Sequence, residues 1–273
     1  MPAGVHIILH TGVIGCRIIN GEKQRITAAV TNSFMPCNGR FPLLITLSGL
    51  FFAAGALAGA ATVLAVIVAG VLFTLLANFI LTRTILREAR PHFSLELPPY
   101  RRPRFFKTVG KALYEKALKV LIRAVVFSAP FSAVIVLGAY FKIGDNSLLE
   151  IAGNFLNPAG RVFGVDGFVL LAFILALPAN EIFLPVLLMC YTSSGTLTEL
   201  SMPALHSLLL SNGWTVLTAV NVMILCLLHF PCATTLITLK KETSAKWAAV
   251  GFFLPLLFGL VLCLITSFVG RLI

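Results

Sequence analysis

Long apolar runs alternate with short polar segments along the chain. The runs cover residues 41–57, 61–81, 120–141, 163–189, 214–230 and 247–269. Most of them approach the roughly 20 residues that an α-helix needs to cross the hydrocarbon core of a bilayer. The pattern predicts an all-α, polytopic membrane protein with about six membrane segments. It also predicts an external polar loop at residues 143–160, between the third and fourth runs.

Prolines with polar neighbours interrupt the apolar pattern in three stretches, at residues 31–42, 177–181 and 228–235. Irregular backbone at membrane depth finds no water for its N–H and C=O groups, so it is tolerated only where it is buried in protein or lines a cavity. Paired helix breaks in two halves of a chain indicate the central site of a transporter. We therefore expect the two Pro-Cys stretches, 31–42 and 228–235, to lie near a shared site.

Basic residues constrain the number of membrane crossings. They concentrate at residues 87–123 and again at residues 240–246, and the positive-inside rule places both groups in the cytoplasm. Three apolar runs separate these groups, whereas two segments on one side require an even number of crossings. We therefore expect the run at 163–189 to be broken or re-entrant near Glu181. The alternative is that a short segment at 202–210 enters the bilayer.

Charge also divides the chain into three regions, namely 1–86 with a helical hairpin, a basic cytoplasmic segment at 87–119, and 120–273. Apolar residues at helical spacing over 105–123 favour an amphipathic helix lying in the membrane interface. A basic, solvated helix is the alternative for that stretch.

Composition excludes an ordinary soluble globule. The mean hydropathy is +0.97 and only 11% of residues are charged, compared with about a quarter in soluble domains. The net charge of +11 does not indicate nucleic-acid binding, because the basic residues lie at the ends of apolar runs. Six cysteines without a CxxC pair favour free thiols over a disulfide framework. Residues 1–9 show no signal-peptide pattern.

Motifs of catalytic chemistry are missing from the sequence. Gly110-Lys111 has no glycine-rich loop before it, so it is not a phosphate-binding loop. No H-E-x-x-H, G-x-S-x-G or zinc-finger spacing occurs either. We therefore expect a chain that is not an enzyme, holds no cofactor and binds no nucleotide itself.

Sulfur, carboxylate and amide groups gather at the three proline breaks. Thiolate and thioether sulfur are soft ligands that suit transition metals, whereas Ca²⁺ and Mg²⁺ prefer oxygen. A charged residue inside an apolar run costs about 2.5 to 3.5 kcal/mol on insertion scales, so it usually faces a partner or a pathway. We therefore expect a transient site for a divalent first-row metal. Its expected ligands are Cys37, Cys232, Glu181 and Met35, with Asn38, Asn180 and His229 as supporting donors.

Each candidate also has a purely structural interpretation. Buried cysteine is a common core residue, the Glu181 carboxylate could reach the interface at a span end, and His229 could bond to backbone. Asp166 is predicted to be the N-cap of the fourth apolar run. The remaining cysteines of the later spans are predicted to be packing residues, namely Cys190, Cys226 and Cys263.

Five short motifs mark the breaks and the basic segments. They are Pro-Cys-Asn-Gly-Arg-Phe-Pro at 36–42, Glu-Leu-Pro-Pro-Tyr at 96–100, Ala-Asn-Glu at 179–181, Phe-Pro-Cys-Ala-Thr at 230–234 and Lys-Lys-Glu-Thr at 240–243. Together with residues 17–25, they closely resemble the membrane portion of the bacterial ferrous iron transport protein B family. The resemblance covers nearly the whole chain from about residue 12.

The resemblance implies uptake of Fe²⁺ across the bacterial inner membrane. It also implies two Gate repeats of the nucleoside-recognition type, with a partial first Gate region in 1–86 and the family's C-terminal and second Gate region in 120–273. In the family, cysteines at the positions of Cys37 and Cys232 are proposed to contact iron. Glu181 matches a polar position of the second Gate.

Two features of the family lack a counterpart in the sequence. Family members begin with a cytoplasmic GTPase domain, a helical linker domain and further spans. A Gly-Cys-Asn element of the first Gate also has no clear match, which leaves the role of Cys16 open. We therefore expect a transport subunit that works with a separate GTPase, a fragment of a longer protein, or a homologue for another solute. In the first two cases GTP acts only through another domain.

The sequence thus predicts a multi-pass inner-membrane permease subunit for Fe²⁺, in contact with lipid and with no nucleic-acid partner. It leaves open whether the protein forms homo-oligomers. One alternative is a non-transporting scaffold that docks a soluble partner through residues 87–123, for which saturable metal binding is not expected. Another is a permease for nucleosides or other organic solutes, whose solute binding should be insensitive to thiol blocking.

Overall fold

The computed structural model describes residues 12–19, 21–37, 39–52, 56–84, 119–143, 146–192 and 200–272. Asn38 lies outside the described residues. The basic segment predicted at 87–119 lies outside them except for its last residue, and so does most of the amphipathic helix predicted at 105–123.

Helices form nearly all of the regular structure that is described. The first half contains η1 (Cys16–Ile18), α2 (Glu22–Thr31), η2 (Asn32–Phe34), α3 (Phe41–Phe51), α4 (Ala56–Thr84) and α6 (Lys119–Tyr140). A short hairpin of β1 (Lys142–Ile143) and β2 (Asn146–Ser147) follows. The second half contains α7 (Leu148–Val162), α8 (Gly167–Leu175), η4 (Asn180–Ile182), α9 (Phe183–Thr192), α10 (Met202–Ser211), α11 (Val216–Leu228), α12 (Ala233–Glu242) and α13 (Ala245–Leu272). The predicted all-α class is confirmed.

Three helical stretches are long and apolar enough to cross a membrane, namely Ala58–Thr84, Val216–Glu242 and Ala245–Leu272. Helices α7 and α8 meet at a bend of 110° and would make a fourth span if taken together. The described residues therefore give three to four spans, and the predicted six are not confirmed. Helices α3, α8 and α9 contain only 11, 9 and 10 residues, which is too short to cross about 30 Å of hydrocarbon.

The predicted polar loop at 143–160 is wrong, because most of it is helix α7. Ser147 caps this helix by accepting a hydrogen bond from the Glu150 N–H over 3.2 Å. Buried Leu149, Gly153 and Gly160 share one face of the helix, at spacings of four and seven residues. The polar residues that suggested a loop are interspersed with them, and Asn157 on this face accepts a hydrogen bond from the Gly167 N–H of α8.

The predicted interruption of the apolar run at 163–189 is present in the structure. Helix α8 ends at Leu175, and the chain continues through Pro178 into the single turn η4 before α9 begins. A second interruption separates α11 from α12 at His229–Cys232, within the span Val216–Glu242.

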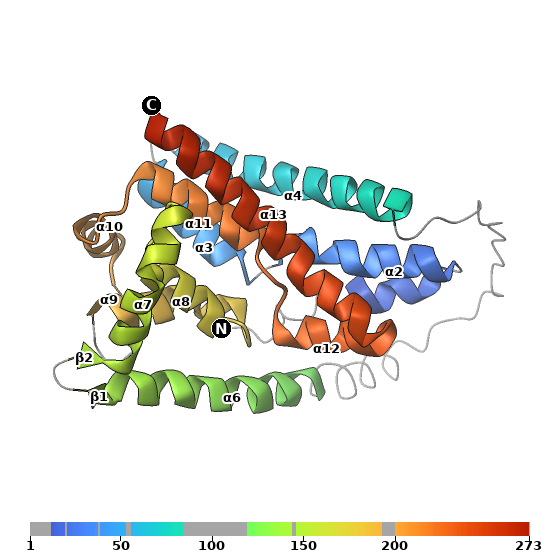
Figure 1. Cartoon of the computed structure of the whole chain (residues 1–273), viewed down its shortest axis with the longest axis horizontal. Coiled ribbons are helices and arrows are strands. Elements are labelled where there is room, and N and C mark those ends of the chain that lie inside the picture. The colour runs from blue at the N-terminus through green and yellow to red at the C-terminus, as the bar shows by residue number, and fades with distance from the viewer. Residues whose placement is uncertain are drawn as a thin grey trace.

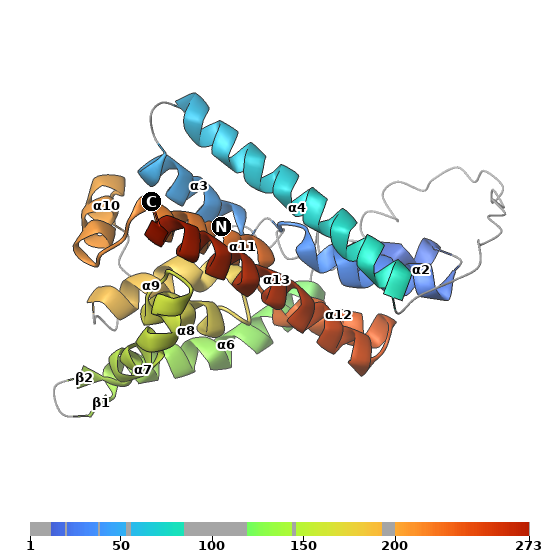
Figure 2. The ribbon, with the colours of Figure 1, turned by 45° about the horizontal axis from the view of Figure 1, so that its top comes forward.

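The main core lies where α3, α8, α9 and α11 pack together. Leu44, Leu187 and Val222 are fully buried there. Figure 1 shows α4 along the top of the molecule and α13 crossing it diagonally, with α2 and α12 towards one end and α10 and the hairpin at the other. The turned view in Figure 2 shows that α4 lies at the edge of the molecule. Its span has only 11% of residues buried, against 72% for Val216–Glu242.

An ion pair joins the N-terminal segment to the end of α12. The Arg17 guanidinium donates to the Glu242 carboxylate through Nε at 2.6 Å and Nη2 at 2.5 Å. This contact gathers η1, α2 and α12 at the end of the molecule that carries Lys240 and Lys241.

Candidate functional site

Three irregular segments meet at one place in the fold, which we call the junction. They are residues 35–37 with 39–40 before α3, residues 176–182 between α8 and α9, and residues 229–232 between α11 and α12. The N–H of Ala233 donates to the Leu177 carbonyl over 3.0 Å and so joins the second segment to the third. The breaks at the two Pro-Cys pairs therefore come together with the break at Pro178.

Asn180 connects the side chains of all three segments. Its carboxamide lies 3.9 Å from Cys37 Sγ and 3.2 Å from His229 Nε2. All three residues are buried. The sequence predicted each of them as a site residue, and the structure places a thiol, an amide and an imidazole in one hydrogen-bonded group.

The hydrogen bonds of His229 define which ring nitrogen carries the proton. Nδ1 lies 3.1 Å from the Leu225 carbonyl and 2.9 Å from the Cys226 carbonyl, and both groups can only accept. Nδ1 is therefore the N–H, and a neutral ring has its lone pair on Nε2. The two ends of an amide are assigned from such networks. In the structure Asn180 Nδ2 donates to Cys37 Sγ and Oδ1 faces His229 Nε2. A neutral ring with its lone pair on Nε2 would favour the amide turned over, with its NH₂ donating to Nε2.

Arg40 fastens the first segment to the third, although it is only 1% exposed. Its Nη1 donates to the Leu227 carbonyl at 2.7 Å, and its Nη2 donates to the carbonyls of His229 at 3.0 Å and Phe230 at 3.4 Å. Carbonyls at the end of a helix lack intrahelical partners and carry partial negative charge. The guanidinium therefore stabilises the broken end of α11.

Sequence reasoning missed Arg40 and the position of Cys226. The Cys226 thiol donates to the Arg40 carbonyl over 3.8 Å, so a residue predicted to be packing also lies against the junction. The signal for Arg40 was available, since it stands between Pro36-Cys37 and a run of apolar residues.

Cys232 is the buried N-cap residue of α12. Its Sγ lies 3.1 Å from Thr234 Oγ1 and 3.2 Å from Thr235 Oγ1. The thiol thus contacts the hydroxyls of the first turn of its own helix, which places sulfur and oxygen donors side by side.

Glu181 and Met35 have exposed side chains, in contrast to the buried group around Asn180. Glu181 lies beside the first segment, because a Cβ added at Gly39 would be 3.1 Å from Glu181 Cγ. Its carboxylate therefore belongs to the edge of the junction. Among the residues that the structure describes, no three His, Cys, Asp or Glu side chains are placed to hold one metal ion together.

Asp166 caps helix α8, as predicted. Its Oδ1 accepts a hydrogen bond from the Val169 N–H over 2.8 Å, and its Oδ2 accepts one from the Tyr191 hydroxyl. The Tyr191 oxygen in turn accepts from Trp214 Nε1 over 2.7 Å. This carboxylate is therefore committed to holding α8, α9 and the start of α11 together.

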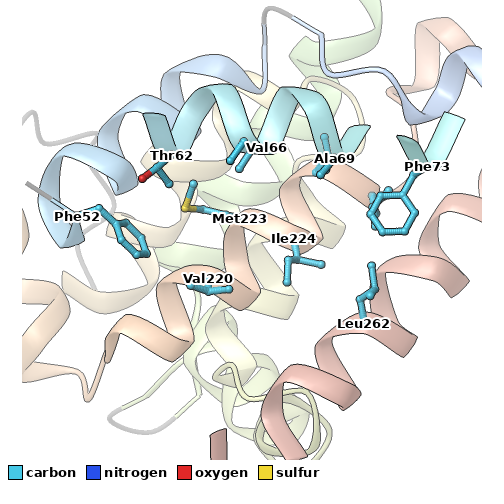
Figure 3. A pocket seen from close by; sticks show the side chains of 12 residues that line it. Phe52, Thr62, Val66, Ala69, Phe73, Val220, Met223, Ile224 and Leu262 are labelled. Atoms are coloured by element: carbon cyan, nitrogen blue, oxygen red, sulfur yellow. The ribbon is translucent and has the colours of Figure 1, made fainter. Parts of the chain in front are cut away.

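An apolar cavity of about 280 Å³ lies between α4, α11 and α13. Figure 3 shows Val66 and Ala69 of α4 facing Val220 and Ile224 of α11 across it. The hydroxyl of Thr62 at its edge already donates to the Ala58 carbonyl. A cavity lined in this way offers a cation too few ligands, so the junction is the better candidate for ion contact.

Known proteins are similar to the chain over most of its length. Residues 63–116 match the family described as Ferrous iron transport protein B C terminus. The Fe(2+) transporter FeoB of Staphylococcus aureus strain COL is 31% identical over 279 residues, covering 95% of this chain and 39% of that protein. No solved structure matches the chain.

More distant relatives carry the same name. The Fe(2+) transporter FeoB of Methanocaldococcus jannaschii is 25% identical over 96% of this chain and 39% of that protein. The Fe(2+) transporter FeoB of Leptospira biflexa is also 25% identical, over 94% of this chain and 40% of that protein. The chain spans about two fifths of the length of these relatives. On these matches, the chain belongs to the ferrous iron transport protein B family.

Proposed function

We propose that this chain forms part of a transmembrane path for Fe²⁺ and that the ion exchanges ligands at the junction. The main support is the contact of Asn180 with both Cys37 and His229, which gathers sulfur, nitrogen and oxygen donors from all three breaks. Sulfur and imidazole are suitable ligands for divalent first-row metals. The relatives are named Fe(2+) transporter, which supports Fe²⁺ as the transported ion.

The donor groups of the junction suit transient binding of Fe²⁺ better than tight binding. When the Asn180 amide turns away, the His229 Nε2 lone pair and the Cys37 sulfur face the same space. The Arg40 charge nearby disfavours a dication there, which keeps binding weak. Conduction requires sites that bind well enough for entry and weakly enough for release. The ion could next bind Cys232 and the two threonine hydroxyls beside it. Glu181, at the edge of the junction, provides a further ligand.

The proposal places the chain in the bacterial inner membrane as a multi-pass protein with two Gate-type halves. The chain itself performs no covalent catalysis and holds no resident cofactor. GTP contributes only through a GTPase domain that belongs to a longer protein or to a separate subunit. The greater length of the relatives is consistent with such further domains.

Anaerobic Fe²⁺ titration of the full chain in detergent micelles tests the proposal. We expect saturable Fe²⁺ binding, much weaker Mg²⁺ binding, and at least about tenfold weaker Fe²⁺ binding in Cys37→Ser and His229→Gln. Cys263→Ser is the matched control, because it changes a buried thiol that bonds to the Asn221 carbonyl, outside the junction. Equal Fe²⁺ affinity in all four proteins would overturn the proposal.

The same titration separates the alternatives. A scaffold that docks a soluble partner has no reason to bind Fe²⁺ saturably. A permease for an organic solute would bind its solute after the thiols have been blocked. Either result would reassign the function while leaving the family membership in place.

A further inference from the structure

A second, polar cavity of about 470 Å³ opens near the start of the span Val216–Glu242. Lys240 and Lys241 lie at the other end of this span. The lining of the cavity comes from α7, the turn before α8, the loop between α10 and α11, and the last turn of α13. Arg161 and Arg271 line it together with Trp214 and Asp166. None of these residues takes part in the proposed Fe²⁺ path, so the cavity stands apart from the junction.

Two guanidinium groups give this cavity its positive charge. Arg271 Nη2 donates to the backbone carbonyl of Arg161 over 2.5 Å, which holds the Arg271 side chain against the end of α7. In the described part of the chain, neither guanidinium forms an ion pair. Both side chains are exposed, so their remaining N–H donors are open to a ligand.

Among the described residues, the carboxylate in the lining forms no ion pair with these arginines. Both oxygens of Asp166 already accept hydrogen bonds, one from the Val169 N–H and one from the Tyr191 hydroxyl. Two unpaired guanidiniums against one committed carboxylate leave the cavity suited to an anion. Guanidinium forks fit phosphate oxygens in particular.

The cavity lies at the ends of two candidate spans. Trp214 stands just before Val216, where one span begins, and Arg271 stands at the end of the span Ala245–Leu272. Trp214 itself is only 3% exposed. Arg271 is exposed at the end of its span, where a long basic side chain can reach the headgroup level. Lys240 and Lys241 lie at the opposite end of the first of these spans, so the cavity belongs to the other membrane surface.

Helices that contribute to the lining also carry exposed apolar residues. Phe155 of α7, Val216 of α11 and Phe268 of α13 are 83%, 53% and 67% exposed. Apolar surface next to a cationic pocket at the end of a span fits acyl chains beneath a headgroup.

From these observations we propose that the cavity binds an anionic phospholipid, with the phosphate held between Arg161 and Arg271 and the acyl chains along the exposed apolar residues. We choose a lipid over a free phosphate ester, because α11 and α13, which contribute to the lining, belong to apolar spans with exposed apolar side chains. The site would anchor α7, α8 and α13 to one membrane surface.

Native mass spectrometry of the full chain, released from bilayer discs of equal phosphatidylglycerol and phosphatidylcholine, tests this assignment. We expect a retained phosphatidylglycerol adduct in the wild type and at least a tenfold loss of it in Arg161→Gln/Arg271→Gln. Arg161→Lys/Arg271→Lys keeps the charge and should retain most of the adduct, which also shows that the pocket tolerates substitution. Lys240→Gln/Lys241→Gln is the control for net charge and should retain the adduct as well.

Three outcomes would overturn the proposal. The first is equal retention of both lipids by the wild type, because this would show that charge is not recognised. The second is retention of phosphatidylglycerol by the glutamine variant. The third is binding of soluble glycerol 3-phosphate with no lipid adduct, which would assign the pocket to a free phosphate ester.

Discussion

Arg40 and Leu227 lie 187 residues apart in the sequence, yet a hydrogen bond of 2.7 Å joins them. The guanidinium donates to the carbonyl of Leu227 in the last turn of α11 and to those of His229 and Phe230 just beyond it. Its removal would leave these acceptors without this donor. The protein accepts the cost of a buried charge here because the broken helix needs donors that its own backbone cannot supply.

Substitution of Arg40 should therefore destabilise the fold more than its apolar surroundings suggest. We expect Arg40→Met to lower the free energy of unfolding by about 3 kcal/mol, with a smaller loss in Arg40→Lys. Chemical denaturation in detergent micelles, followed by helical circular dichroism, measures the difference. Lys241→Met is the control, since that side chain is exposed. A loss no larger than in this control would show that Arg40 is not a structural clamp.

Cys16 gives a prediction about pH. Partial burial raises the pKa of its thiol, and its Sγ donates to the Gly12 carbonyl over 3.2 Å. The raised pKa leaves less thiolate at pH 7 than an ordinary cysteine has, so alkylation should be slow and should quicken about tenfold per pH unit up to the pKa. Peptide mapping after iodoacetamide treatment at pH 7 to 9 measures the rate. The control is Gln24→Cys, which puts a thiol on the exposed face of α2. This thiol should be alkylated faster than Cys16 at pH 7, and equal rates would contradict the prediction.

The sequence predicted which residues at the helix breaks belong to the candidate site, but it did not predict which of them contact each other. The sequence pointed to Cys37, Asn180 and His229 because polar groups beside prolines are costly at membrane depth. It could not show that Asn180 lies between the other two, since this depends on how α8, α9 and α11 pack. Asp166 was predicted correctly because a cap is a local feature.

At the scale of elements, α7 and α8 pack so closely that their backbones are in contact at Gly167. A Cβ added at Gly167 would lie 2.1 Å from the Gly153 carbonyl oxygen and 2.5 Å from the Asn157 nitrogen. The Gly167 N–H also donates to Asn157 Oδ1 over 2.9 Å. The 110° bend between the two helices therefore depends on the absence of a side chain at this position.

Gly167→Ala should destabilise the protein by about 3 kcal/mol or prevent folding, because backbone atoms cannot move aside as a flexible side chain can. Gly49→Ala is the matched control: no atom lies within 4 Å of its added Cβ, and alanine favours a helix. Thermal unfolding in detergent measures both variants. Equal transition temperatures would contradict the close packing of α7 on α8.

The sequence predicted which runs form helices better than it predicted which of those helices cross the membrane. The apolar runs became helices, but α3, α8 and α9 are short elements buried against others and not complete crossings. Hydropathy measures apolar content and does not tell lipid contact from protein contact. The two long spans Ala58–Thr84 and Val216–Glu242 illustrate this, with 11% and 72% of their residues buried. Helix α7 was missed for the opposite reason, because its polar faces concealed a regular apolar stripe.

For the whole molecule, the charges give an orientation in the membrane. Lys240, Lys241 and Lys246 lie at one end of the buried span, together with Arg17 and its partner on α12. By the positive-inside rule, we predict that this end faces the cytoplasm. The loop between α10 and α11 then faces the opposite side.

Cysteine labelling in intact cells tests this orientation. A membrane-impermeant maleimide should label Ser211→Cys, at the end of α10, from outside the cell. Lys241→Cys should be labelled only after the membrane is made permeable. Both side chains are exposed, so accessibility within the protein does not distinguish them. Labelling of Lys241→Cys in intact cells would reverse the assigned orientation.

The most direct test of the central proposal is X-ray absorption at the iron edge of Fe²⁺ bound to the full chain. The junction predicts sulfur and imidazole nitrogen among the nearest neighbours of the ion, and it predicts loss of the sulfur signal in Cys37→Ser but not in Cys263→Ser. A neighbour shell composed only of oxygen, unchanged by Cys37→Ser, would contradict the account.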